Sequence, residues 1–125
     1  MNDDAANSQA AETQAAVDRR WRTIGALVAM VGVMAGAFGA HALKENPLVE
    51  SWKTGAHYQL LHGIALTIPG LPLLSRRLIL TGAILFAGSL YGLVALHLNW
   101  LGPVTPLGGL CMISGWGVAA WKGRG

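Results

Sequence analysis

The sequence predicts an all-α protein, an integral-membrane four-helix bundle. Four long apolar runs cover residues 23–43, 49–68, 78–97 and 106–121. The charged residues lie outside these runs, apart from Glu50 and Lys53 near the start of the second. A bilayer core of about 30 Å requires a helix of roughly 17–25 residues. The first three runs meet this length and the fourth is marginal, so lipid is the expected solvent for most of the chain.

The first 20 residues form a separate polar segment. They are rich in alanine and show no hydrophobic period, so we expect a disordered or loosely helical cytoplasmic tail before a membrane bundle over residues 21–125. Arg19, Arg20 and Arg22 before an apolar run resemble the start of a secretory signal. We expect no cleavage, because the run continues to Leu43 and three more spans follow.

Helix-breaking residues separate the runs. Residues 44–47 (KENP) end the first run, and residues 69–72 (PGLP) end or kink the second. The basic pair at residues 76–77 marks the boundary before the third. Thr105 is a good N-cap and Pro106 suits the first helical position, so the fourth helix is expected to start there.

The basic residues predict the orientation. With four spans, seven of nine Lys and Arg residues fall on the side of the termini, and only Lys44 and Lys53 fall on the other. The seven are Arg19, Arg20, Arg22, Arg76, Arg77, Lys122 and Arg124. This bias predicts a multi-pass protein of the plasma (inner) membrane with both termini cytoplasmic. It also explains the net charge of +3 without a nucleic-acid partner.

Polar residues inside the runs form the candidate site. Thr54, Tyr58 and His62 recur at a spacing of four and share one stripe of a helix. His57 lies about 140° around the helix from His62, so the two are badly placed to bind one ion. Depth along the spans predicts an outer-half polar layer. Its candidate members are His41, Tyr58, Gln59, His62, Ser89, Tyr91 and Thr105.

Two interpretations of this layer stay open. Polar side chains in membrane bundles hydrogen-bond across helices and hold them together. Alternatively, intramembrane histidines mark a site for a haem, a metal, a quinone, a proton or a small solute. Conduction is disfavoured because no Asp or Glu lies deep in a span. The first interpretation is preferred, with His62 neutral and bonded to Tyr91, Ser89 or the first span, and no metal or cofactor is expected.

Catalysis finds little support. The sequence holds no carboxylate pair within the spans, no GxSxG, no P-loop and no nucleophile with an obvious base. Cys111 is the single cysteine and lies inside the fourth run, which excludes an intramolecular disulfide. We therefore expect a protein that is not an enzyme.

Small residues predict close helix packing. Glycines and alanines recur at spacings of four or seven within the runs, a pattern that lets backbones approach in membranes. The expected helix-packing glycines are Gly32, Gly36, Gly39, Gly88, Gly92, Gly108 and Gly115. Packing within one chain is the simpler interpretation, and a homo-oligomer or a partner interface is the alternative.

Four segments in order resemble the YgdD-like family of small membrane proteins of unknown function. They are GAFGAHAL at residues 36–43, YQLLHGIAL at 58–66, FAGSLY at 86–91, and TPLGG at 105–109 with GW at 115–116. The resemblance implies four membrane helices and carries no catalytic residues. The expected role is a structural or interaction subunit, with the lipid bilayer and a membrane-protein partner or second copy as its contacts.

Overall fold

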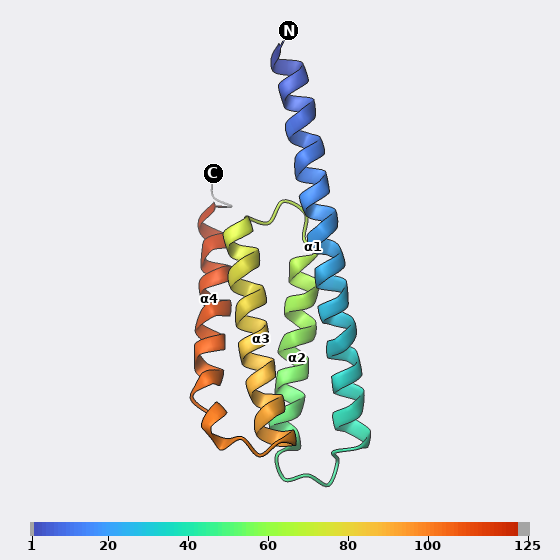
Figure 1. The fold of residues 1–125 in the computed structure, drawn as a ribbon, viewed down its shortest axis with the longest axis vertical. Helices are drawn as coiled ribbons and strands as arrows, with labels where there is room; N and C mark the ends of the chain where they lie inside the picture. Colours follow the sequence, from blue (N-terminus) through green and yellow to red (C-terminus); the bar gives the residue numbers. More distant parts are fainter. Residues whose placement is uncertain (1, 123–125) are drawn as a thin grey trace.

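The computed structural model describes residues 2–122 and contains four long α-helices (Figure 1). They are α1 (Asn2–His41), α2 (Val49–Leu66), α3 (Leu73–Ala95) and α4 (Val104–Lys122), and a short 3₁₀ turn, η1 (Asn99–Leu101), precedes α4. Arg124, which the charge argument uses, lies outside the described residues. The all-α membrane bundle predicted from the sequence is confirmed.

The helices run up and down, and each packs on its neighbour in the chain. α1 packs on α2, α2 on α3, and α3 on α4, so the two central helices carry α1 and α4 on their flanks (Figure 1). The start of α3 and the end of α4 lie at the same end of the bundle, and α1 extends well past that end. We call it the arginine end, because it carries Arg19, Arg20, Arg22, Arg76 and Arg77.

The N-terminal segment is helical. α1 is continuous from Asn2 to His41, and its 40 residues correspond to about 60 Å, roughly twice a bilayer core. Residues 2–16 are exposed, and the first residues of α1 that pack on the bundle are Val17 and Trp21. The structure thus has a projecting helix where the sequence indicates a disordered or loosely helical tail.

Two helix starts differ from the sequence prediction. α3 begins at Leu73 after Pro72, whose fixed backbone geometry suits a helix start, so Arg76 lies inside the first turns of the helix. α4 begins at Val104, one residue before the expected N-cap. Thr105 is therefore not a cap, and its hydroxyl bonds to Ser89 of α3 at 2.5 Å.

Glycines form two tight helix seams. Between α1 and α2, a Cβ on Gly32 would lie 3.0 Å from Leu60 N, and one on Gly39 would lie 2.6 Å from the Trp52 ring. Between α3 and α4, one on Gly115 would lie 2.7 Å from Ile79 Cγ1, and Gly108 abuts the backbone of Phe86. Since these glycines admit no side chain, the backbones can approach closely.

The remaining glycines differ in how closely they are packed. A Cβ on Gly36 would meet only Ala56 at 3.9 Å, and one on Gly88 would meet nothing within 4 Å. A Cβ on Gly92 would lie 2.5 Å from Leu101 Cδ1, which belongs to the turn before α4 rather than to a helix seam. The seam on α1 also includes Gly25, so its spacing is seven, through residues 25, 32 and 39.

Three helical segments of the described chain are long and apolar enough to cross a membrane. They are α1, α3 and the stretch Asn99–Lys122. α2 has 18 residues but falls outside this set, and it carries polar or charged side chains from its first turn to His62, including Glu50, Lys53, His57 and Gln59. α2 lies between α1 and α3, where several of its polar side chains find partners.

Candidate functional site

The expected polar layer is divided between two faces of α2. Gln59 lies toward α1 and α3, whereas Tyr58 and His62 lie toward α4. The division follows from helix geometry, because consecutive residues are about 100° apart around the axis. The structure therefore brings the predicted residues together as separate contacts rather than as one site.

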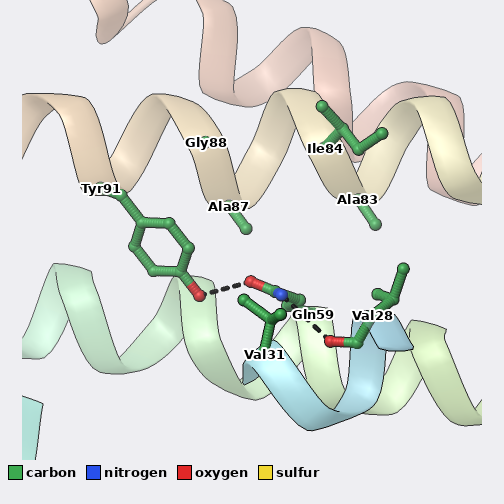
Figure 2. Close-up of a pocket in the computed structure, with 8 residues that line it drawn as sticks. All are labelled: Val28, Val31, Gln59, Ala83, Ile84, Ala87, Gly88 and Tyr91. Carbon is green, nitrogen blue, oxygen red and sulfur yellow. Dashed lines mark hydrogen bonds between the residues drawn. The ribbon is translucent and has the colours of Figure 1, made fainter. Parts of the chain in front are cut away.

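Gln59 joins three helices. Its Oε1 accepts a hydrogen bond from the Tyr91 hydroxyl of α3 at 2.6 Å, and its Nε2 donates to the carbonyl of Val28 in α1 at 3.0 Å (Figure 2). Ala83 and Ala87 of α3 line the same small cavity of about 230 Å³ beside this relay. One amide thus holds the middle of α1, α2 and α3 together.

Trp52 strengthens the same face. Its indole Nε1 donates to the carbonyl of Ala35 at 2.7 Å. The ring lies between Phe38, at 5.5 Å between centroids, and Tyr91, at 4.5 Å. This internal bond was not predicted from the sequence. Gly39 is the sequence feature that could have indicated this bond, because a glycine at this position of α1 leaves room for the Trp52 indole.

His62 is buried on the opposite face, with 6% of its surface exposed. Its Nδ1 lies 2.7 Å from the Tyr58 carbonyl, and its Nε2 lies 3.0 Å from Trp116 Nε1. A carbonyl only accepts and an indole only donates, so Nδ1 carries the proton and the imidazole is neutral. The cross-helix partner is Trp116 of α4, where the sequence pointed to Tyr91, Ser89 or the first span.

The other predicted members lie apart from these contacts. Ser89 and Thr105 form their own link between α3 and α4, and Ser89 also donates to the Phe86 carbonyl at 2.9 Å. His41 ends α1 on an exposed surface. We use "middle layer" below for the contacts of Val28, Gln59, His62, Tyr91 and Trp116.

A groove lies along α2 and α4 beside His62. It encloses about 450 Å³. Its walls are mostly aromatic or apolar, and its lining includes Tyr58, His62, Phe86, Met112, Ile113 and Trp116. Tyr58 is 40% exposed, and its ring packs edge-on against Phe86 at 5.1 Å. Its hydroxyl has no hydrogen-bond partner among residues 2–122, in contrast to that of Tyr91.

The arginine end holds a second polar cluster, which sequence reasoning interpreted only as a topology signal. Arg76 is 1% exposed, and its Nη2 donates to Asp18 Oδ1 at 2.7 Å and to the Ile68 carbonyl at 2.8 Å. Its Nε and Nη1 have no partner within the described chain, and the guanidinium carbon lies 6.0 Å from the Trp21 ring centroid. The neighbouring Ser75 donates to the Gly115 carbonyl at 2.7 Å.

Asp18 accepts hydrogen bonds from three donors. Besides Arg76, it accepts hydrogen bonds from the backbone N–H of Gly70 at 3.1 Å and from Gln14 Nε2 at 2.9 Å. The hydrogen bond from Arg76, followed by that from Gly70, lowers the pKa of Asp18 below its usual 3.8. The carboxylate therefore stays charged at neutral pH and attaches α1 to the start of α3.

Between residues 2 and 122, no three His, Cys, Asp or Glu side chains come close enough to hold a metal ion. Cys111 is a free, half-buried thiol on α4. The clusters described above connect helices, through Gln59, His62 and the Asp18–Arg76 pair.

Comparison with known proteins agrees with the fold. The chain matches the family model described as protein of unknown function (DUF423) over residues 35–109. A UPF0382 membrane protein of Staphylococcus aureus is 40% identical over 104 residues, covering 74% of this chain and 85% of the relative. A UPF0382 membrane protein of Schizosaccharomyces pombe is 36% identical over 108 residues, covering 74% and 92%. YwdK of Bacillus subtilis, another UPF0382 membrane protein, is 34% identical over 106 residues, covering 74% and 86%. No solved structure matches the chain.

Proposed function

This chain belongs to the DUF423 family of proteins of unknown function, and we propose that it is a non-enzymatic structural or interaction subunit of the membrane. The Gln59 relay carries this proposal. Both ends of its amide are bonded to other helices, so this polar group of α2 serves packing. Neutral hydrogen bonds of this kind join helices in lipid, together with van der Waals packing.

We further propose four spans with both termini in the cytoplasm. α2 lies between two apolar helices, and its length of roughly 27 Å is about that of a bilayer core. It therefore adds a further span to the three apolar segments, although many of its own side chains are polar. The arginine end then faces the cytoplasm, as the positive-inside bias requires. A cysteine introduced at Trp100, in the exposed turn η1, should react with an impermeant maleimide added to intact cells. Reaction only after permeabilisation contradicts this orientation.

The subunit role is tested by isolating the full chain in a mild detergent. Quantitative mass spectrometry of the eluate should show a larger membrane protein in fixed ratio, with no visible chromophore and no stoichiometric metal. A chromophore or a metal in a one-to-one ratio contradicts the proposal. So does a chain that elutes without any partner protein after crosslinking in the native membrane.

The groove beside His62 favours a second candidate function, which is binding of a lipid-soluble molecule. The observation behind it is the unpaired hydroxyl of Tyr58, which is costly in lipid and offers one donor at an aromatic wall. A flat molecule with a carbonyl oxygen, such as a quinone, has matching chemistry. Solvent extraction of the purified protein should then yield one such compound, and the yield should fall in Tyr58→Phe but stay unchanged in His57→Phe. Equal yields from the two variants contradict it.

A further inference from the structure

A cavity of about 230 Å³ opens at the arginine end, between α1 and the start of α3. α1 contributes Val17, Arg20, Trp21 and Ile24, and α3 contributes Leu73 and Arg77. The spacings of three or four place each set on one helix face. The Asp18–Arg76 pair joins the same two helices and holds these faces next to one another.

The two arginines of this cavity are free to take an anion. Arg20 and Arg77 are exposed, and neither has an ion-pair partner among the described residues. Asp18 is the single acid in residues 17–24 and 73–77, and it is already bound to Arg76. The cavity therefore combines two uncompensated positive charges with the apolar part of its lining, Val17, Ile24 and Leu73, which we call its apolar floor.

The buried arginine adds to this positive field. Arg76 stacks near the Trp21 ring, which also lines the cavity, and two of its nitrogens have no partner in the described chain. The positive charge of Arg76 is compensated by one carboxylate, that of Asp18, whose side chain is 22% exposed. The charge balance next to the cavity thus favours an anion, and the apolar floor favours a ligand with hydrocarbon attached to that anion.

We propose that this cavity binds the phosphate of an anionic glycerophospholipid from the surrounding leaflet. Arg20 and Arg77 hold the phosphate oxygens, and the glycerol and the first part of an acyl chain lie on Ile24 and Leu73. The cavity lies where the charged residues give way to the apolar part of α1, which is the level of lipid headgroups. Guanidinium groups match phosphate geometry, and basic pockets at this depth recognise such lipids. A free phosphate would use the two arginines and leave the apolar floor uncovered.

Native mass spectrometry of the full chain in detergent tests the proposal, with phosphatidylglycerol, phosphatidylcholine and inorganic phosphate as separate probes. Phosphatidylglycerol should bind in a one-to-one ratio and more tightly than phosphatidylcholine. The variant R20Q/R77Q should weaken this binding about 25-fold, or about fivefold for each arginine. The control R19Q/R22Q removes the same charge from residues outside the cavity and should retain binding within about twofold.

Several results overturn the proposal. Equal affinity for the two lipids, or equal loss in the two double variants, means that only the net charge of the surface acts. Inorganic phosphate that displaces the lipid at equal concentration means that the site takes a soluble anion. The substituted side chains are exposed, and matched melting curves show that the variants remain folded. Lipid binding is measured without any partner protein, so this test stands apart from that of the subunit role.

Discussion

The arginine end and the middle layer both join helices through polar side chains, but with different chemistry. At the arginine end a charged pair, Asp18 and Arg76, connects α1 to α3. In the middle layer each cross-helix bond is neutral, as between Tyr91 and Gln59 or between Trp116 and His62. Depth explains the difference. A charge near the headgroups retains water and counter-ions nearby, whereas a charge at the centre of the bilayer is expensive.

The two regions also bury their polar groups in different ways. The middle layer satisfies its groups almost completely, since both nitrogens of His62 are bonded and both ends of the Gln59 amide are bonded. Arg76 keeps two nitrogens without partners in the described chain although it is nearly inaccessible. Burying Arg76 therefore costs more free energy than burying the neutral groups of the middle layer. The loss of a single partner of Arg76 is expected to destabilise the fold more strongly.

The largest effect is expected from Arg76→Ala. The substitution leaves Asp18 and the Ile68 carbonyl without their donor and removes the packing on Trp21, so the free energy of unfolding should fall by about 3 kcal/mol. Thermal unfolding in detergent measures it. Arg22→Ala removes the same charge from an exposed position and should change stability by less than about 0.5 kcal/mol. Equal losses of stability in the two variants would mean that the Asp18–Arg76 pair does not stabilise the fold.

A smaller loss is expected from His62→Leu. The leucine fills much of the same space, but it leaves Trp116 Nε1 and the Tyr58 carbonyl without the imidazole. We expect a cost of about 1–2 kcal/mol. His57→Leu, on the exposed side of the same helix, serves as the control and should be near neutral. If His57→Leu lowers the free energy of unfolding as much as His62→Leu does, the hydrogen bond between His62 and Trp116 makes no specific contribution to stability.

The two tyrosines provide a matched pair of hydroxyl deletions. Tyr91→Phe removes the bond to Gln59 and should cost about 0.6 kcal/mol, the average for such bonds in membranes. Tyr58→Phe deletes a hydroxyl that has no partner in the described chain, so it should cost nothing or stabilise slightly. Melting curves of the two variants in the same detergent give the difference directly. A larger loss in Tyr58→Phe would show that its hydroxyl has a bound partner.

Acid should weaken the arginine end before the middle layer. The pKa of Asp18 is lower in the folded state than its usual 3.8, so the stability from this group is present above pH 3.8 and is lost as the pH falls through the lowered value. Hydrogen exchange measured as the pH falls from about 5 to about 2 should show opening of α1 around Asp18 below pH 3.8, before opening around Val28. Asp18→Asn should remove this pH dependence, and an unchanged profile in that variant would assign it to another group.

Much of the fold is predictable from the sequence, because apolar length and charge placement act locally. The apolar runs predict the end of α1 and the start of α2 within two residues. The first run ends at Leu43 and α1 ends at His41, whereas the second run and α2 both start at Val49. The start of α3 was harder to predict, since Pro72 supports a helix five residues before the expected boundary. The seam glycines were only partly predictable. A spacing of four marks Gly32 and Gly36 equally, but only Gly32 faces a neighbouring backbone closely.

The sequence by itself determined a membrane protein of four helices whose charges lie at the ends and whose polar side chains cluster on the second helix. Only the tertiary structure decided which of those side chains meet. Tyr58 and Gln59 are adjacent in sequence but face different helices, and Asp18 and Arg76 meet across 58 positions of the chain. The physical reason is that hydropathy and charge position depend on each residue alone. A hydrogen bond depends on the rotation and neighbours of two helices, which arise only when the whole bundle packs.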